Sequence, residues 1–544
     1  MVSRREFLTI GTGGLAAASL PARAWAQAPA QAPKRGGTLS LRTWDPPHFD
    51  HILAHAYKTH VVISFTHSRL LKHKAGPGVR PGAFPIEGDL AESWQQVNDT
   101  TYVFKLKKGV RFHAKPPVNG RELTAEDVRY TYERILTDKG SVNVSMYRAI
   151  AKVEAVDKYT VRFTLKEPFA WFLDMVANPM AGAIIAKECV EKFGDLKKPE
   201  AVIGTGPWML DGYKPNVSVT LVRNPTYFVA GLPYIDRVEM LVDEDNASRI
   251  AAFLGGKYDL GWEFPGTINR TDWVQIAEPL KKRRPNLKTL EYPSNVMNTI
   301  DMRTDKPPFN DVRVRRALSL AVDRKRWVAE SFDGQGIEDH GPVPAPLREW
   351  KLSARDLGEG ARYLDHDPAL ASKLLAEAGF PGGLKIRCFN AQGQGAESIE
   401  EVERLAASFR TIGVELTTAG EEPGTYVRGS FVSRFEETSW GVSPLFTEVD
   451  GYLYTLFRSG QPGNKSQVAD RELDAMLEAQ RHALSRPARK KIIDDIQRHL
   501  ADRVYYVFTP APRTVHSWAP RVRGYGPRNS LDRGAQLEAV WLDR

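Results

Sequence analysis

The chain has 544 residues and a formal net charge of +9; 42% of its residues are hydrophobic and 26% are charged. This length exceeds the ~250–300 residues at which one hydrophobic core stops growing, so two or three core units are expected. The densest basic run, residues 281–284, is interpreted as a solvated surface turn, and the scattered charges argue against a nucleic-acid-binding face.

The first 26 residues are organised like an export signal. Arg4 and Arg5 precede a mildly apolar stretch at residues 9–20, and small-residue cleavage sites follow, the last of which ends at Ala26. The paired arginines resemble the twin-arginine signal, which marks proteins that are exported after folding. The apolar stretch is shorter than the ~20 residues that span a bilayer, so a retained anchor helix is the less favoured alternative. We predict cleavage after Ala26, with Ala28 as the second choice, and a flexible leader over residues 27–35. The mature protein is expected to be periplasmic and without stable membrane insertion.

Alternating apolar and polar residues predict strands in the first half of the chain. The alternation covers residues 102–106, 159–165 and 217–221, and each of these segments has one face that would be buried. Thr124-Ala125-Glu126-Asp127 reads as a capping box, in which the Thr hydroxyl and the Asp carboxylate accept hydrogen bonds from free N–H groups. A helix is therefore predicted to begin there.

Helices and strands also alternate in the second half of the chain. Asp367-Pro368 predicts the start of a helix that Gly379 ends. Two further helices have apolar faces that cover residues 402–412 and 492–500. The first leads into a strand at residues 414–417 and the second into an apolar strand at residues 504–508. This alternation predicts an α/β protein with mixed sheets. Pro- and Gly-rich connectors are too short to be free linkers, so the core units are expected to be interleaved; they lie at residues 75–85, 115–120, 341–346 and 379–383.

Cysteine and histidine give little sign of metal or redox chemistry. Cys189 and Cys388 lie far apart in the sequence and are predicted to be buried free thiols rather than a disulfide. Six of the 12 histidines fall within residues 48–73, where His51 and His55 would share one face of a helix. Because the spacing is irregular and no carboxylate is suitably placed, we interpret this cluster as a polar helix surface, with a metal site as the minor alternative.

A series of motifs resembles one known family over essentially the whole chain after the signal. They include Gly204-Thr205-Gly206-Pro207-Trp208 and the segments at residues 36–39, 90–94, 101–113, 123–128, 223–227, 231–236, 307–318, 321–324 and 373–380. In this order they are similar to the family 5 extracellular solute-binding proteins, the peptide- and nickel-type receptors of ABC importers. The motifs themselves read mostly as turns and helix caps, so they indicate the scaffold and not the ligand.

The resemblance implies a two-lobed periplasmic-binding-protein fold with mixed sheets and an extra domain inserted in the first lobe. Carried onto this chain, the first lobe comprises residues 36–65, 200–292 and 506–544. The inserted domain comprises residues 66–199, and the second lobe comprises residues 293–505. The implied mechanism is hinge closure, in which a ligand that touches both lobes shifts the population toward the closed form.

The resemblance also suggests which residues line the cleft. Peptide-binding relatives often place a tryptophan and then an aspartate that pairs with the peptide's α-amino group. Here Val442 and Ser443 follow Trp440 where the acid is expected, and Asp450 is a loosely spaced substitute. Trp440 is either an aromatic wall of the cleft or an ordinary core residue. The full set of predicted ligand-binding residues is Trp44, Trp262, Phe264, Asn295, Trp440, Ser443 and Asp450.

The predicted function is capture of a short peptide or related organic solute and its delivery to the permease subunits of an ABC importer. The absence of this acid favours a non-peptide ligand, such as an opine, an oligosaccharide or a metal chelate. Presentation of the ligand to a sensor is a further alternative function. No dinucleotide, nucleophile-elbow or phosphate-loop motif is present, so no enzyme activity and no cofactor are predicted. We expect a monomer that binds no nucleic acid.

Overall fold

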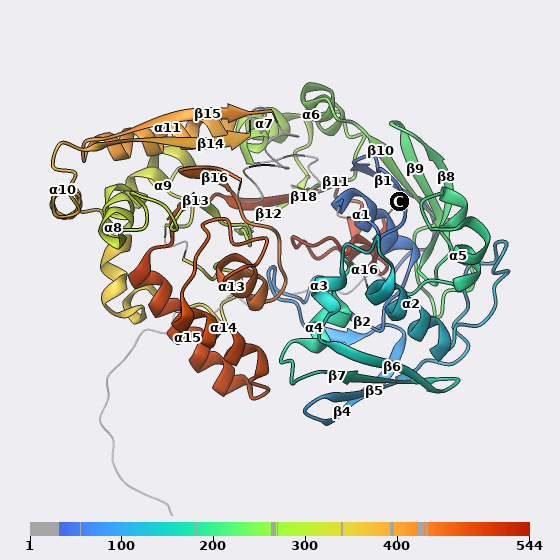
Figure 1. Cartoon of the computed structure of the whole chain (residues 1–544). Helices are drawn as coiled ribbons and strands as arrows, with labels where there is room; N and C mark the ends of the chain where they lie inside the picture. Colours follow the sequence, from blue (N-terminus) through green and yellow to red (C-terminus); the bar gives the residue numbers. More distant parts are fainter. Residues whose placement is uncertain are drawn as a thin grey trace, which may run out of the picture. The chain divides into compact units, whose positions relative to one another are not determined.

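The computed structural model describes residues 32–54, 56–180, 182–262, 268, 270–338, 341–391, 396–422, 429 and 434–543. The chain divides into two units, Met1–Pro33 and Lys34–Arg544, and the second contains the folded protein (Figure 1). The predicted export signal lies outside the described residues, as does most of the leader. Within the described part of the chain, no helix combines the length and apolar character needed to cross a membrane.

The first lobe is built on a four-stranded sheet of mixed direction. Its strand order is β1 (Thr38–Thr43), β10 (Arg237–Val242), β9 (Ser218–Arg223) and β8 (Trp208–Lys214). β1 runs parallel to β10, and the other pairs are antiparallel. The sheet packs against α1 (Tyr57–Thr66) through Phe65 and Trp208, whose ring centroids lie 5.6 Å apart. The predicted strand at residues 217–221 is present, although Val217 itself is 55% exposed.

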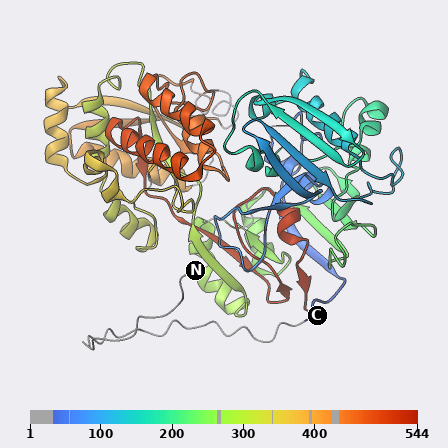
Figure 2. The ribbon, with the colours of Figure 1, turned by 90° about the horizontal axis from the view of Figure 1, so that it is seen from below.

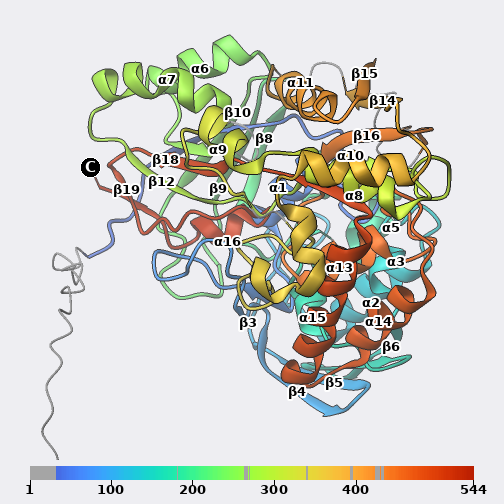
Figure 3. The same ribbon diagram turned by 90° about the vertical axis from the view of Figure 1, so that its left-hand side faces the viewer.

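A second, three-stranded sheet completes the first lobe. Its order is β11 (Leu260–Trp262), β18 (Arg513–Trp518) and β12 (Lys288–Pro293), and all of its pairs are antiparallel. Two neighbouring helices, α6 (Asn246–Leu254) and α7 (Arg270–Arg283), belong to the same part of the chain (Figure 3). Phe253, Tyr258 and Leu280 bury a small core there.

The C-terminal segment packs against residues from the start of the folded chain. It comprises β19 (Val522–Arg523), α16 (Arg533–Leu537) and β20 (Trp541–Leu542). The Arg69 guanidinium pairs with Asp532, and the Lys72 ammonium pairs with Glu538. The backbone of Gly534 lies so close to Ser64 that an added Cβ would sit 1.8 Å from the Ser64 carbonyl oxygen. Only a glycine fits this contact between α16 and α1.

The inserted domain has its own antiparallel sheet and core. The strand order is β4 (Ala91–Asn98), β5 (Thr101–Leu106), β7 (Thr160–Leu165) and β6 (Ile150–Asp157). The strands predicted at residues 102–106 and 159–165 are β5 and β7. The short pair β2 (Leu71–His73) and β3 (Ile86–Gly88) lies beside it. The helical elements are α2 (Ala125–Thr137), α3 (Val144–Tyr147), α4 (Phe172–Ala177), α5 (Lys187–Phe193) and the 3₁₀ turn η1 (Pro199–Ala201). The predicted capping box of Thr124 and Asp127 is confirmed at the start of α2.

The second lobe is built on a five-stranded mixed sheet. Its order is β15 (Val414–Glu421), β14 (Leu384–Ala391), β16 (Thr438–Val442), β13 (Asn298–Met302) and β17 (Tyr506–Thr509). One core contains α8 (Val312–Ala321), α9 (Arg324–Phe332), α10 (Pro368–Glu377) and α11 (Ala396–Arg410), and α11 lies along β15 in Figure 1. A second core contains α13 (Val449–Phe457), α14 (Arg471–His482) and α15 (Arg486–Arg503). The 3₁₀ turns are η2 (Ala354–Asp356) and η3 (Gly358–Leu364).

The predicted α/β fold, with two lobes and an inserted domain, is confirmed, and so are several local signals. Asp367 caps α10 by accepting a hydrogen bond from the Leu370 N–H at 2.9 Å. Cys189 and Cys388 are buried free thiols, as predicted. Gly204 and Gly206 are needed for a close approach of two backbones, because an added Cβ at either position would meet Thr66 within 2.5 Å.

The prediction for the histidine cluster is wrong. His51, His60, His67 and His73 are at most 4% exposed, so they do not form a polar helix surface. His51 lies in a bend before α1, and His55 is outside the described residues. Tertiary packing buries these rings. Backbone carbonyl oxygens accept the N–H groups of two of them: His51 Nε2 donates to Ala183 O at 3.2 Å and His60 Nε2 donates to Ala54 O at 3.0 Å.

Candidate ligand-binding site

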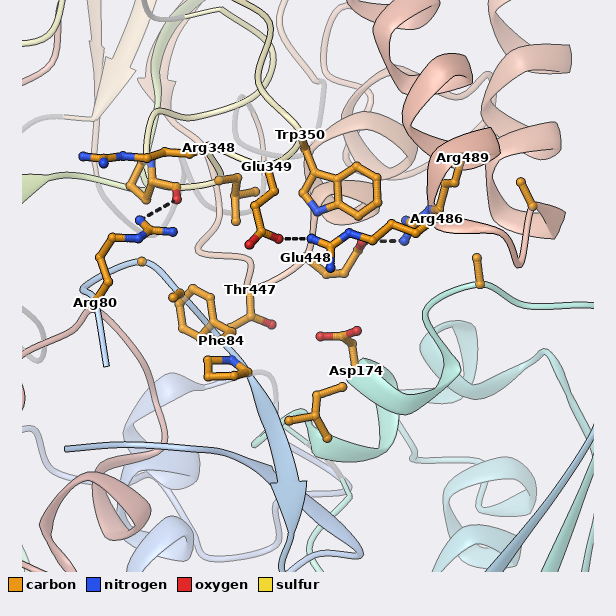
Figure 4. A pocket seen from close by; sticks show the side chains of 18 of the residues that line it. Arg80, Phe84, Asp174, Arg348, Glu349, Trp350, Thr447, Glu448, Arg486 and Arg489 are labelled. Atoms are coloured by element: carbon orange, nitrogen blue, oxygen red, sulfur yellow. Dashed lines mark hydrogen bonds and ion pairs between the residues drawn. The ribbon is translucent and has the colours of Figure 1, made fainter. Parts of the chain in front are cut away.

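A pocket of about 460 Å³ lies between the inserted domain and the second lobe (Figure 4). Its volume falls in the range of ordinary small-molecule sites. One wall comes from the segment that leads into β3 and from the start of α4. The other comes from three segments of the second lobe. The lining residues used below are Arg80, Phe84, Asp174, Trp350, Glu448, Arg486 and Arg489.

The segment before β3 fixes one end of the pocket. Arg80 Nη1 donates a hydrogen bond to Pro346 O at 3.1 Å, which joins this segment directly to the second lobe. The Phe84 ring packs edge-on against His73, with ring centroids 5.4 Å apart. The guanidinium of the buried Arg528 lies 5.5 Å from the Phe84 ring centroid. Phe84 is therefore held by the C-terminal segment and offers a fixed aromatic surface.

The start of α15 supplies the opposite wall. The guanidinium groups of Arg486 and Arg489 lie 5.4 and 5.0 Å from the Trp350 ring centroid. Arg486 pairs with Glu349, and Arg489 Nη1 lies 2.8 Å from Glu448 Oε1. These ion pairs and cation–π contacts hold the ring and both guanidinium groups in place around the pocket.

Asp174 is the carboxylate of the inserted-domain wall. It belongs to the first turn of α4, and its side chain is 26% exposed. Burial raises the pKa of Asp174 to about 6, although the charges of Arg489 and Arg486 partly oppose that shift. The imidazole of His73 lies close by, with its Nε2 3.7 Å from Asp174 Oδ1. Burial also lowers the pKa of His73 to about 3, so its imidazole is neutral near pH 7.

Direct contacts between the inserted domain and the second lobe lie beside the pocket. Ala170 N donates to Arg481 O at 2.7 Å, and Arg148 Nη2 donates to the Tyr454 hydroxyl at 3.1 Å. The Arg481 guanidinium lies 3.8 Å from the Tyr454 ring centroid and 5.0 Å from that of Phe169. In Figure 2 the sheet of the inserted domain, in blue and cyan, faces the orange and red helices of the second lobe.

The chain connects the first lobe to the second through adjacent crossovers. One runs from β12 to β13 through residues 294–297, and another returns from β17 to β18 through residues 510–512. β12 pairs with β18 and β13 pairs with β17, so these two crossovers lie side by side. Short connections of this kind are where a hinge can bend without disrupting either core.

The sequence model of the bacterial extracellular solute-binding proteins, family 5 Middle, matches residues 85–464. The chain belongs to this family. Heme-binding protein A of Haemophilus influenzae is 27% identical over 474 residues, which cover 82% of each chain. Glutathione-binding protein GsiB of Escherichia coli K12 is 28% identical over 402 residues, 71% of this chain and 73% of that protein. The structure of the Helicobacter pylori periplasmic binding protein DppA with the peptide STSA superimposes with a TM-score of 0.77 at 23% identity, covering 94% of this chain and 99% of DppA.

Several residues predicted to bind ligand in this family 5 protein lie near the crossovers. The buried Asn295 donates from Nδ2 to Phe446 O at 3.3 Å, and its carbonyl accepts from the Tyr452 hydroxyl. Ser443 Oγ accepts a hydrogen bond from Met297 N at 3.0 Å. Trp440 lies in β16 opposite Ile300 of β13, packs in the core of the sheet and is 4% exposed. Asn295 and Ser443 are therefore engaged in hydrogen bonds with the backbone, and Trp440 is packed in the core.

The remaining predicted residues are dispersed. Asp450 is buried, accepts a hydrogen bond from Gln480 and lies 3.2 Å from Arg481 Nε. Trp44 is half-buried, and the Arg42 guanidinium lies over it, 5.4 Å from the centroid of the Trp44 ring. Trp262 ends β11, and Phe264 lies outside the described residues. Among the predicted residues whose side chains are described, none lines the pocket. Asp450 is connected to it indirectly: Gln480 donates a hydrogen bond to Asp450 and accepts one at 3.0 Å from Nε of the pocket residue Arg489.

Sequence reasoning missed the residues that do line the pocket. They come from separate segments and belong to none of the family motifs. One signal was available: the Pro- and Gly-rich connectors at residues 75–85 and 341–346 meet at this pocket, where Arg80 bonds to Pro346. Connectors on the surface of a rigid scaffold are common places for binding residues. Within the described residues, no group of three or more His, Cys, Asp or Glu side chains is arranged to hold a metal ion.

Proposed function

We propose that this protein captures a small organic solute in the periplasm and delivers it unchanged to the permease of an ABC importer. The observation that carries the proposal is the pocket between the inserted domain and the second lobe, because its walls belong to separately packed cores. A solute that touches both walls stabilises the arrangement in which they meet, and the importer would recognise that arrangement. Family membership supports transport rather than catalysis.

The named relatives support the class of function and leave the ligand open. Their names record binding of heme and glutathione, and the DppA structure contains a peptide. For this chain we propose a short peptide or related organic solute, with an opine, an oligosaccharide or a metal chelate as alternatives. Presentation of the ligand to a sensor is a second role for the same pocket. Measuring ligand uptake after deletion of the gene separates the two roles, since only import requires the permease.

Several sequence predictions belong to this proposal. They are a twin-arginine signal cleaved after Ala26, a monomeric mature protein, and the lobe boundaries given above. Most buried hydrophobic residues between Leu70 and Ile203 share one core, which supports the inserted domain at residues 66–199. The paired crossovers support a second lobe that begins near residue 293. Of the predicted cleft residues, we retain Asn295 and Ser443 because they lie at the crossover, and Asp450 because it adjoins Arg489 through Gln480.

A thermal-shift screen of the purified mature chain over peptides, sugars and metal chelates tests the proposal. A ligand at 100 times its Kd stabilises the native state by about 2.7 kcal/mol, which raises the Tm measurably. Arg486→Gln changes the pocket wall and should weaken this shift. Arg498→Gln lies on the same helix, outside the pocket, and should leave it unchanged. If no solute raised the Tm, or if both variants behaved alike, this pocket would not be the capture site.

A further inference from the structure

The basic run at residues 281–284 lies at one end of the first lobe, where α6 and α7 both end. Residues 281–283 form the last turn of α7, so the surface turn predicted from the sequence is wrong for these three residues. The half-buried Arg284 donates from Nη1 to Phe253 O at 2.9 Å and to Tyr258 O at 3.4 Å. Arg284 therefore fastens the end of α7 to the end of α6, whereas residues 281–283 are exposed.

The two helices carry opposite charges at their two ends. At the starts, the Asp245 carboxylate caps α6, and Asp272 in the first turn of α7 accepts a hydrogen bond from Asn246 Nδ2 at 3.2 Å. At the ends lie exposed cations, and we define the basic corner as Lys257, Lys281, Lys282, Arg283 and Lys288. Both charges suit the helix dipoles, so this packing of the two helices gathers positive charge at one place on the surface.

Two contacts bring Lys257 and Lys288 to the end of α7. Lys257 directly precedes Tyr258, whose carbonyl oxygen accepts the hydrogen bond from Arg284. Leu287 N donates to Arg284 O at 3.0 Å, and this turn leads directly to Lys288, the first residue of β12. The cations of the basic corner therefore come from three segments of the chain that meet at one place.

Few carboxylates offset this charge. Residues 275–291 include five basic residues and two acidic ones, Glu278 and Glu291. Glu278 Oε1 lies 2.6 Å from Lys281 Nζ, and this hydrogen bond, together with the charges of Lys281 and Lys282, lowers the pKa of Glu278. Among the residues that the structure describes, no other member of the basic corner than Lys281 has a carboxylate oxygen within 4.0 Å of its charged group. The basic corner thus keeps an excess of positive charge.

An exposed apolar side chain adjoins these cations. Leu290 is 37% exposed and belongs to β12, which lies at the edge of its sheet. Lys288 and Leu290 are two positions apart in this strand, so their side chains are on the same face. No member of the basic corner lines the pocket. These features suit an extended anionic surface better than a small ligand, because electrostatic attraction needs no pocket and an apolar side chain can enter the headgroup layer of a bilayer.

We propose that the basic corner binds an anionic phospholipid surface, so that the protein rests on the membrane that carries the importer. This inference rests on the proposed function and adds a second interaction surface to it. In Figure 3, α6 and α7 lie at the opposite end of the molecule from β4 and β5 of the inserted domain. Because none of its residues lines the pocket, contact of the basic corner with lipid leaves solute binding unobstructed.

The strength of this binding should depend on the number of cations and on salt. Each Lys or Arg held close to an anionic membrane raises the partitioning of a protein onto it about fivefold. Salt screens the attraction within about 10 Å at about 0.1 M ionic strength, so binding should fall at least tenfold between about 50 mM and about 300 mM salt. This dependence is measured on the unmodified protein and needs no variant.

Co-sedimentation of the full mature chain with lipid vesicles tests the proposal. Vesicles of phosphatidylglycerol and phosphatidylcholine at about 3:7 should bind the protein at least tenfold more tightly than phosphatidylcholine alone, at about 50 mM salt. Lys282→Glu combined with Arg283→Glu should weaken that binding at least tenfold, whereas Lys282→Arg combined with Arg283→Lys keeps the charge and should bind like the original protein. Lys139→Glu combined with Lys198→Glu is the matched control, because both side chains are exposed and lie outside α6, α7 and β12. The Tm of each variant checks that it folds.

The possible results separate this inference from the proposed function. Equal binding to both kinds of vesicle, unchanged binding by the Lys282→Glu and Arg283→Glu variant, or an equal loss in the control would overturn the role of the basic corner. So would complete displacement by glycerol 3-phosphate at the phosphate concentration of the lipid, because the corner would then bind a free phosphate compound. Retention by the purified permease without vesicle binding would assign the corner to an acidic protein surface instead. The solute screen uses no vesicles, so solute capture stands or falls independently of these results.

Discussion

The ion pair between Asp50 and Arg134 gives a sharp prediction about stability. Arg134 Nη2 lies 2.6 Å from Asp50 Oδ2, and the two side chains are 6% and 0% exposed. Asp50 also accepts hydrogen bonds from Ile52 N at 3.1 Å and Leu196 N at 3.0 Å. Arg134→Met keeps most of the apolar stem but leaves the Asp50 carboxylate buried without its cation. Removing one partner of a buried pair costs about 3–5 kcal/mol, which is the expected loss in the free energy of unfolding.

The same helix supplies a matched control. Arg129 in α2 pairs with Glu126 at 2.8 Å and with Glu133 at 2.6 Å, but its side chain is 37% exposed. Exposed pairs of this kind contribute about 0–1 kcal/mol, so Arg129→Met should shift the urea midpoint little. Equilibrium urea denaturation followed by tryptophan fluorescence compares the two variants. A second variant, Asp50→Asn combined with Arg134→Met, should recover part of the loss, because the uncompensated charge is gone.

The loss in Arg134→Met should also depend on pH. Burial alone raises the pKa of Asp50, but the hydrogen bonds and charge of Arg134 outweigh burial, and the pKa lies below its ordinary value. In the original protein, this pair stabilises the fold above pH ~3.8 and loses its effect as the pH falls further. In the variant, the pKa of Asp50 rises, so its penalty is relieved on acidification. The two proteins should converge toward pH 4. A loss below 1 kcal/mol at pH 7, or a difference that does not change with pH, would refute the reasoning.

Three further predictions rest on buried groups. Burial lowers the pKa of His113 to about 4. Protonation of this group should therefore lower the free energy of unfolding by on the order of 3 kcal/mol as the pH drops from 6.5 to 4, and urea midpoints independent of pH would contradict this. Burial raises the pKa of the Cys388 thiol to about 12, so it should react with Ellman's reagent only after denaturation, and rapid labelling of the native protein would show otherwise. Gly206→Ala should destabilise by about 1–3 kcal/mol or more, because its Cβ would lie 2.5 Å from the Thr66 carbonyl carbon, whereas Gly78→Ala, with nothing within 4 Å, should stay within about 0.5 kcal/mol.

Local signals predicted much of the fold. A cap such as Asp367 acts on N–H groups a few residues away, and the alternation in β5 and β7 follows from the period of a strand, so neither needs tertiary information. The lobes and the inserted domain followed from the motif resemblance. Burial of the histidines could not be deduced in this way. The carbonyl that accepts the His51 N–H belongs to Ala183, which is 132 positions further along the chain.

The candidate site was harder to predict for the same reason. Asp174 appears in the sequence as an ordinary acidic residue of a short helix, because the pocket it faces requires Trp350 and Arg489 from the second lobe. Trp440 and Ser443 were chosen from the pattern of a family motif, and the structure places them in the core and beside Met297. A motif identifies a position on the scaffold, whereas a binding surface depends on which distant segments meet there.

The contacts of α16 bear on how this chain can acquire its native state. Gly534 packs against Ser64. Arg69 pairs with Asp532 and Lys72 pairs with Glu538, which lie more than 460 positions later in the chain. Cores that need such remote segments form slowly, because long loops must close before their contacts form. Until the segment that carries Asp532 and Glu538 has been synthesised, the cationic side chains of Arg69 and Lys72 lack these acidic partners. The packing around Ser64, Arg69 and Lys72 is therefore complete only after residues 532–538 have been synthesised.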